Sequence, residues 1–113
     1  MKTISKMGAQ GDLLVRKIRK IPAKAEEVPA QAGRHVVAHS ETGHHHYLDS
    51  SGVTLLRVPS DPLVCYLRIE GDWADVVHAR PHDTHETIRL PRGDYETRRQ
   101  REYTPRGWRR VED

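Results

Sequence analysis

Apolar and polar residues alternate with a period of two along much of this chain. The pattern is clearest in residues 63–69, where Leu63, Cys65, Leu67 and Ile69 fall on one side. Because successive side chains of a β-strand point to opposite faces, this period predicts half-buried strands. The strand-like runs are residues 34–39, 44–48, 53–58, 63–69, 73–78, 86–90 and 95–103.

Short glycine- and proline-containing segments separate these runs and predict turns at residues 50–52, 59–62, 70–72 and 91–94. About seven to nine short strands at roughly ten-residue spacing are typical of an all-β fold, and we expect a single small barrel or sandwich. Residues 1–10 are predicted to form a flexible arm, and residues 11–113 a single β-domain.

Residues 11–21 fit two kinds of element. Leu14, Ile18 and Ile21 have the spacing of one helix face, with Asp12 as a cap. The β-branched content and the stop at Pro22 favour a strand instead. We favour the strand, and the helix stays open at this point.

The composition limits the core. Hydrophobic residues make up 35% of 113 residues and phenylalanine is absent, so a bound metal or a partner subunit would help to stabilise the fold. No run approaches the roughly 20 apolar residues of a membrane span, and no secretory signal is visible. The single cysteine, Cys65, lies in an apolar run and is expected to be buried. These features predict a cytoplasmic protein, or a virion-associated one if the chain is phage-encoded, with no membrane partner.

The formal charge is +3, and it is concentrated near the end of the chain. Basic surfaces attract nucleic acid or acidic partners, and Tyr103 and Trp108 could stack on bases. The alternation of residues 95–103 leaves neither face purely apolar, which is typical of an edge or interface strand. We therefore expect a possible homo-oligomer or larger assembly through an edge strand, with nucleic acid as a less favoured partner. The candidate surface consists of Arg98, Arg99, Arg101, Arg106, Arg109 and Arg110.

The eight histidines are grouped, and the first group is His44, His45 and His46. On a strand, His44 and His46 share one face while His45 points to the other. The second group is His78, His82 and His85. Either His82 and His85, or His78 and His82, could add ligands from a loop.

Zinc takes imidazole nitrogens in tetrahedral geometry, often with one position left for water. The sequence therefore predicts a Zn²⁺ site, with Fe²⁺, Mn²⁺ or Ni²⁺ as alternatives. Glu41 and Glu86 are candidate catalytic bases that would act on a bound water. Hydrolysis or other metal-assisted chemistry would follow, and whether the protein is an enzyme is left open.

Two alternatives remain beside a metal site: a polar binding surface without metal, and a structural or assembly protein without catalysis. His35 and His39 are less favoured as residues of such a site. His35 adjoins two valines and is predicted to lie on a strand surface.

Several motifs resemble a family of small uncharacterised bacterial and phage proteins. They are residues 10–14 (QGDLL), 41–46 (ETGHHH), 82–85 (HDTH) and 99–105 (RQREYTP). This resemblance spans residues 10–113 and implies no activity. The pair His44 and His46, with the turn around Pro91 and Gly93, is also similar to the cupins, which are metal-binding β-barrels. The chain departs from cupins because no glutamate follows His46 at the cupin distance and no histidine follows Gly93.

Overall fold

A computed structural model of the chain describes residues 2–10, 12–38, 46–78, 87–99, 101–104 and 107–110. Within these residues the regular structure is entirely β, with eleven strands and no helix, which confirms the predicted all-β class. The described residues accordingly contain no helix that could cross a membrane.

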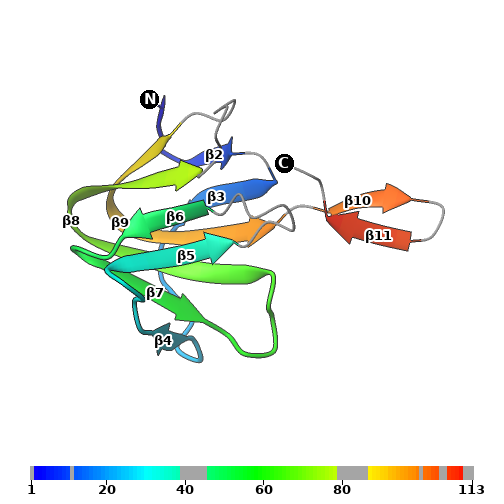
Figure 1. The fold of residues 1–113 in the computed structure, drawn as a ribbon, viewed down its shortest axis with the longest axis horizontal. Helices are drawn as coiled ribbons and strands as arrows, with labels where there is room; N and C mark the ends of the chain where they lie inside the picture. Colours follow the sequence, from blue (N-terminus) through cyan, green and yellow to red (C-terminus); the bar gives the residue numbers. More distant parts are fainter. Residues whose placement is uncertain are drawn as a thin grey trace.

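Nine strands form one continuous sheet in the described part of the chain. Its path runs β2-β3-β9-β8-β6-β5, with β1 paired to β9, β7 to β8 and β4 to β7 (Figure 1). The strands are β1 (Lys2–Thr3), β2 (Met7–Gln10), β3 (Leu13–Ile18), β4 (Glu26–Val28), β5 (Arg34–Ala38), β6 (His46–Asp49), β7 (Val53–Arg57), β8 (Val64–His78) and β9 (Ile88–Arg99).

The long strands β8 and β9 form the centre of the sheet, and they overturn two predicted turns. Ile69 pairs with Gly93 and Trp73 with Pro91, so residues 70–72 of β8 lie opposite the single residue Arg92. The predicted turns at residues 70–72 and 91–94 are therefore wrong as chain reversals. Their glycines and proline instead accommodate a bulge within one continuous strand pair, and bulges bend a sheet.

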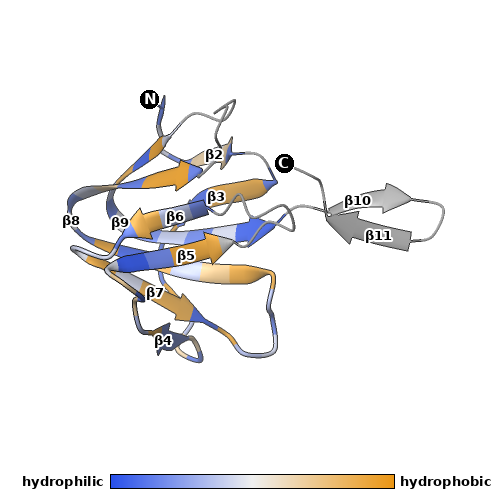
Figure 2. Cartoon of the chain, viewed as in Figure 1, coloured by the Kyte–Doolittle hydropathy of each residue, from blue (hydrophilic) through white to orange (hydrophobic). Residues whose placement is uncertain are grey.

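The sheet folds over on itself into two layers, because β8, which pairs with β9 on both sides of the bulge, pairs with β7 along its first half and with β6 at its end. Figure 1 shows β5 and β6 lying across β3 and β9. Val37 of β5 and Leu48 of β6 pack in one core with Leu13 of β3, Leu67 of β8 and Tyr95 of β9. Hydrophobic and hydrophilic residues interleave along the strands of both layers (Figure 2), as the period of two requires.

The segment predicted as an arm contains two strands. β1 pairs in parallel with β9, and β2 pairs antiparallel with β3. Between them Ile4 is buried in the core, and its backbone N–H donates to the carbonyl of Arg89. A Cβ at Gly8 would overlap the Ile4 side chain, so glycine at this position makes room for it. A single apolar residue such as Ile4 among polar neighbours does not predict a strand from sequence, although its side chain packs this segment against the core.

Strand β3 settles the ambiguity of residues 11–21 in favour of a strand. Its neighbour β9 supports the predicted alternation, since Tyr95 and Thr97 point inward while Arg98 is exposed. The run predicted at residues 95–103 is divided, however, because β9 ends at Arg99.

The remaining two strands form a separate hairpin. β10 (Arg101–Thr104) and β11 (Gly107–Arg110) pair antiparallel with each other in a two-stranded sheet of their own. In Figure 1 this hairpin extends away from the layered body.

Candidate functional site: a buried polar cluster at five strand ends

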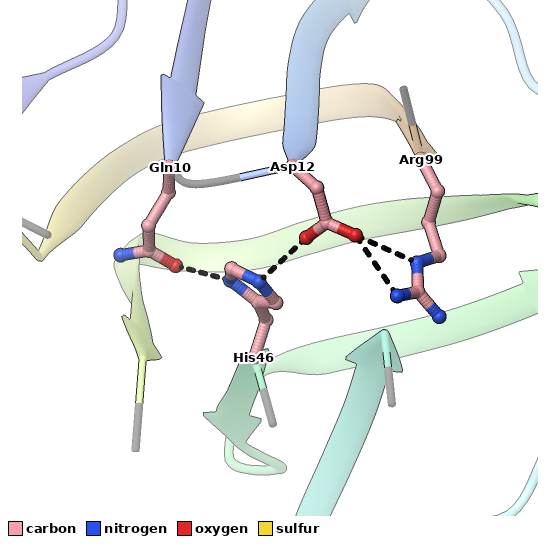
Figure 3. Close-up of polar contacts among 4 residues, drawn as sticks. All are labelled: Gln10, Asp12, His46 and Arg99. Carbon is pink, nitrogen blue, oxygen red and sulfur yellow. Dashed lines mark hydrogen bonds and ion pairs between the residues drawn. The ribbon is translucent and has the colours of Figure 1, made fainter. Parts of the chain in front are cut away.

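Five polar side chains come from strand ends that the fold brings together. Gln10 ends β2, His46 begins β6, His78 ends β8, and Arg99 ends β9. Asp12 immediately precedes β3. Hydrogen bonds or ring stacking connect these five residues, which we call the His46 cluster (Figure 3 draws all of them but His78).

His46 is fully buried and hydrogen-bonded at both ring nitrogens. Its Nδ1 lies 2.9 Å from Oε1 of Gln10, and its Nε2 lies 3.2 Å from Oδ1 of Asp12. Gln10 uses its amide N–H to bond the carbonyl of Val76, at 3.0 Å, which leaves its oxygen facing His46. Both partners of the ring are thus acceptors, so the ring donates to at least one of them and is held between Gln10 and Asp12.

Asp12 connects this ring to an arginine. Its second oxygen, Oδ2, accepts from Nε of Arg99 at 3.1 Å and from a terminal guanidinium nitrogen at 2.9 Å. Asp12 is buried, and the Arg99 side chain is only 10% exposed. A forked bond of this kind favours the ionised carboxylate, which lies between the ring of His46 and the guanidinium of Arg99 (Figure 3). Burying these charges is costly, and their mutual pairing offsets the cost.

His78 stacks on His46 with ring centroids 4.2 Å apart and planes within 7°. The two residues are direct partners across β6 and β8. One member of each histidine group in the sequence, His46 and His78, therefore belongs to the same cross-strand pair. His46 closes the first group, and His78 precedes His82 by four positions.

Most predicted ligands and bases lie outside the described residues: His44, His82, His85, Glu41 and Glu86. His39 and His45, which were not predicted as ligands, also lie outside them. Of the predicted metal ligands, the structure describes His46 and the alternative ligand His78. Within the described ranges no group of three or more His, Cys, Asp or Glu side chains is arranged to hold a metal ion.

The arginine surface is described only in part. Arg98 is exposed and lies 3.6 Å from Glu96, whereas its neighbour Arg99 turns inward to Asp12. Alternation along β9 explains the difference, because consecutive residues face opposite sides. Arg106 and the side chains of Arg101, Arg109 and Arg110 lie outside the described part.

The prediction for His35 is wrong. It is buried, and its Nε2 lies 3.2 Å from the carbonyl of Val53, to which it donates. No hydrogen-bond partner for its Nδ1 is found among the described residues. The alternation of β5 places His35 and Val37 on the buried face and Val36 on the other, a register that the two adjoining valines concealed.

Cys65 is buried, as predicted. Its sulfur lies 2.7 Å from the hydroxyl of Thr97. Burial raises the pKa of the Cys65 thiol, and the Thr97 hydrogen bond and the charge of Arg57 oppose this rise less strongly. A thiol that stays protonated is a poor nucleophile, so Cys65 is a core residue.

Sequence reasoning singled out His78 as an alternative ligand but missed its stacking on His46, the buried roles of Gln10 and Asp12, and the inward role of Arg99. The sequence signal for Gln10 and Asp12 is their position beside a strand end. Gln10 and Asp12 flank a tight link between β2 and β3, where polar side chains adjoin the buried Leu13. Pairing them with residues near position 99 needs the register of β3 with β9, which no local pattern contains.

Fold and cluster together define a small two-layered β-domain with a buried glutamine–histidine–aspartate–arginine network. The chain belongs to the family described as Domain of unknown function (DUF8820), whose model matches residues 9–100. The matched region begins one residue before Gln10 and ends one residue after Arg99, so it encloses the His46 cluster and leaves out the β10–β11 hairpin. No curated protein and no solved structure matches the chain significantly.

Proposed function

We propose that the chain is a small metal-binding β-domain, with zinc as the preferred ion and His44, His46, His82 and His85 as its candidate ligands. The observation that carries the proposal is the cross-strand pair His46 and His78. One pair of neighbouring residues anchors both histidine groups, although about thirty positions separate them in the sequence. Fe²⁺, Mn²⁺ and Ni²⁺ also accept imidazole ligands and are the alternatives.

The sequence separations are compatible with one shared ion. His44 lies two residues before His46, and His82 lies four residues after His78. Since an extended chain covers at most about 3.5 Å per residue, these ligands are confined to within roughly 7 and 14 Å of the stacked pair, measured between Cα atoms. Both groups can therefore contribute imidazoles to the same place.

Asp12 suits the role of an orienting carboxylate for His46. Histidines that bind zinc commonly donate their second N–H to a carboxylate, and Asp12 accepts from Nε2 at 3.2 Å. Ligation through Nδ1 would require loss of its proton and release from Gln10. Glu41 and Glu86 are the candidate bases for a metal-bound water, which would make metal-assisted hydrolysis the accessible chemistry.

Tag-free protein should bind about one Zn²⁺ per chain, measured by elemental analysis and by titration calorimetry. The triple variant H44A/H82A/H85A should lose the ion while keeping its β circular dichroism spectrum. Binding should weaken below about pH 6, where imidazoles protonate and lose their ligating lone pair.

His35→Gln is the matched control, because His35 is also buried but lies at the opposite end of β5 from Ala38, the residue that pairs with His46. It should retain the ion. Substoichiometric zinc in the parent protein, or zinc retained by the triple variant, would contradict the proposal.

A second candidate function is nucleic-acid binding by the hairpin, and its separate two-stranded sheet is the observation that favours it. An isolated hairpin is only marginally stable in water, so a partner would stabilise it. Arg101 pairs in register with Arg110, and Glu102 with Arg109, so three of these four positions are basic. Phosphates would neutralise the positive charge of these residues.

Removing residues 101–113 should then abolish binding to single-stranded DNA in low salt, measured by fluorescence anisotropy. In the intact chain the affinity should fall steeply as salt increases, because phosphate contacts release counterions. Arg16→Gln, which removes an exposed arginine from β3, is the control and should change little. A salt-independent affinity would rule out this function. A protein partner or a second copy of the chain would then be the candidate partner of the hairpin.

A further inference from the structure

The outer face of the sheet carries a hollow that is separate from the His46 cluster. Strand β6 turns His46 and Leu48 inward, so Tyr47 and Asp49 face outward. The hollow has a volume of about 530 Å³. Its chemically distinctive lining residues are Arg34, Tyr47, Asp49, Asp72, Trp73 and Asp75, and we call it the Trp73 hollow.

Trp73 is the unusual residue of this surface. It is 53% exposed, and with Met7 it is one of two large apolar side chains exposed among the described residues. Leaving an indole in water forgoes the stabilisation that its burial would give, so an exposed tryptophan in a hollow is typical of a binding surface. The carbon of the Arg89 guanidinium lies 4.5 Å from the centre of the indole ring, and Arg89 also holds Asp75 at 2.9 and 3.1 Å. These contacts orient the ring.

The charges around the hollow are close to balanced. Asp49, Asp72 and Asp75 are opposed by Arg34, by Arg92 beside Asp72 and by Arg89 on Asp75, so there is no excess positive charge to hold an anion such as phosphate. A cation meets the opposite difficulty, because Arg34 already lies over the ring of Tyr47 at 4.4 Å and Arg89 lies over Trp73. Bringing a third positive charge beside these guanidinium groups would cost repulsion. The suitable ligand is neutral.

We propose that the Trp73 hollow binds a neutral carbohydrate. The apolar C–H face of a sugar ring fits an exposed indole, which offers a flat surface without hydrogen-bonding groups on its face. Sugar hydroxyls can donate to Asp49 and Asp72 and accept from Arg34, matching the acceptors and the donor of the lining. Asp72 is largely exposed and has only a loose contact with Arg92 at 3.5 Å, so its oxygens are available to a ligand. This site does not depend on the proposed metal function.

The test is a glycan array followed by titration calorimetry with the neutral oligosaccharide that binds best. Trp73→Ala should weaken its binding about tenfold or more, because tryptophans at the centre of an interface carry much of the affinity. Trp73→Tyr, which keeps an aromatic face, should restore most of it. Met7→Ala removes the other exposed apolar side chain, on strand β2, and should leave binding unchanged.

Circular dichroism of each variant checks that it is folded, as the exposure of Trp73 leads us to expect. Three results would overturn the proposal: no binding to any neutral glycan, equal affinity of the Trp73→Ala variant, or binding restricted to sulfated and acidic glycans. The last would place recognition on the basic surfaces of the chain instead.

Discussion

Asp12→Asn is expected to lower the free energy of unfolding by about 3–5 kcal/mol, the usual cost of breaking a buried ion pair from one side. Asp12 is the single negative charge between the ring of His46 and the guanidinium of Arg99. Asparagine has nearly the same shape but no charge, so the buried guanidinium of Arg99 would lose the carboxylate that compensates it. The cost is largely that of leaving this cation without compensation in a medium of low dielectric constant.

Urea unfolding of the parent protein and the variant, followed by circular dichroism, measures this difference. Asp75→Asn is the matched control: Asp75 accepts the same forked arrangement from Arg89, but both side chains are 31% exposed. Solvent screening limits such a pair to about 0–1 kcal/mol. Equal losses of unfolding free energy in the two variants would mean that burial adds nothing to the ion pair of Asp12 and Arg99.

Ile4→Ala is expected to cost about 2–5 kcal/mol, as for other large-to-small changes in a core. Ile4 links β1 and β2 and belongs to the same core cluster as Leu13 and Leu90. Its removal leaves a cavity beside Gly8, where no Cβ is available to fill the space. The resulting loss would show that the N-terminal segment contributes to the stability of the sheet.

Thermal and urea unfolding compare this variant with Met7→Ala, a change three positions along the same segment. Met7 is 55% exposed, so its truncation should alter the free energy of unfolding by less than about 0.5 kcal/mol. If Ile4→Ala is as stable as Met7→Ala, residues 1–10 behave as the arm that the sequence suggests.

The period of two was sufficient to predict the strands of this protein, since it follows directly from strand geometry. Residues 53–58 and 63–69 were located within a residue or two as β7 and the first half of β8. Gly52 correctly predicts the turn at residues 50–52, where it has φ of 67°. Gly71, Pro91 and Gly93 are misread as turns at residues 70–72 and 91–94, because a bulge and a turn share a local signature and differ only in pairing.

The candidate site was predicted only in outline. Alternation placed His44 and His46 on one face, but it does not say whether that face meets water or the core. The neighbours that hold the ring of His46 in the core, Gln10 and Asp12, lie more than thirty positions away in the sequence. His35 was misassigned for the same reason, since burial of a histidine depends on the opposite layer of the sheet.

The sequence separations within the His46 cluster bear on the order in which the protein folds. Asp12 and Arg99 are 87 positions apart, and Gln10 bonds a carbonyl 66 positions away. Contacts of such high sequence separation form slowly because the chain must lose loop entropy before they can stabilise it. During synthesis, a ribosome-bound chain cannot complete the network until Arg99 has emerged. Asp12 is then expected to stay exposed to solvent until Arg99 has left the ribosome, and its charge is buried only when β3 and β9 pair.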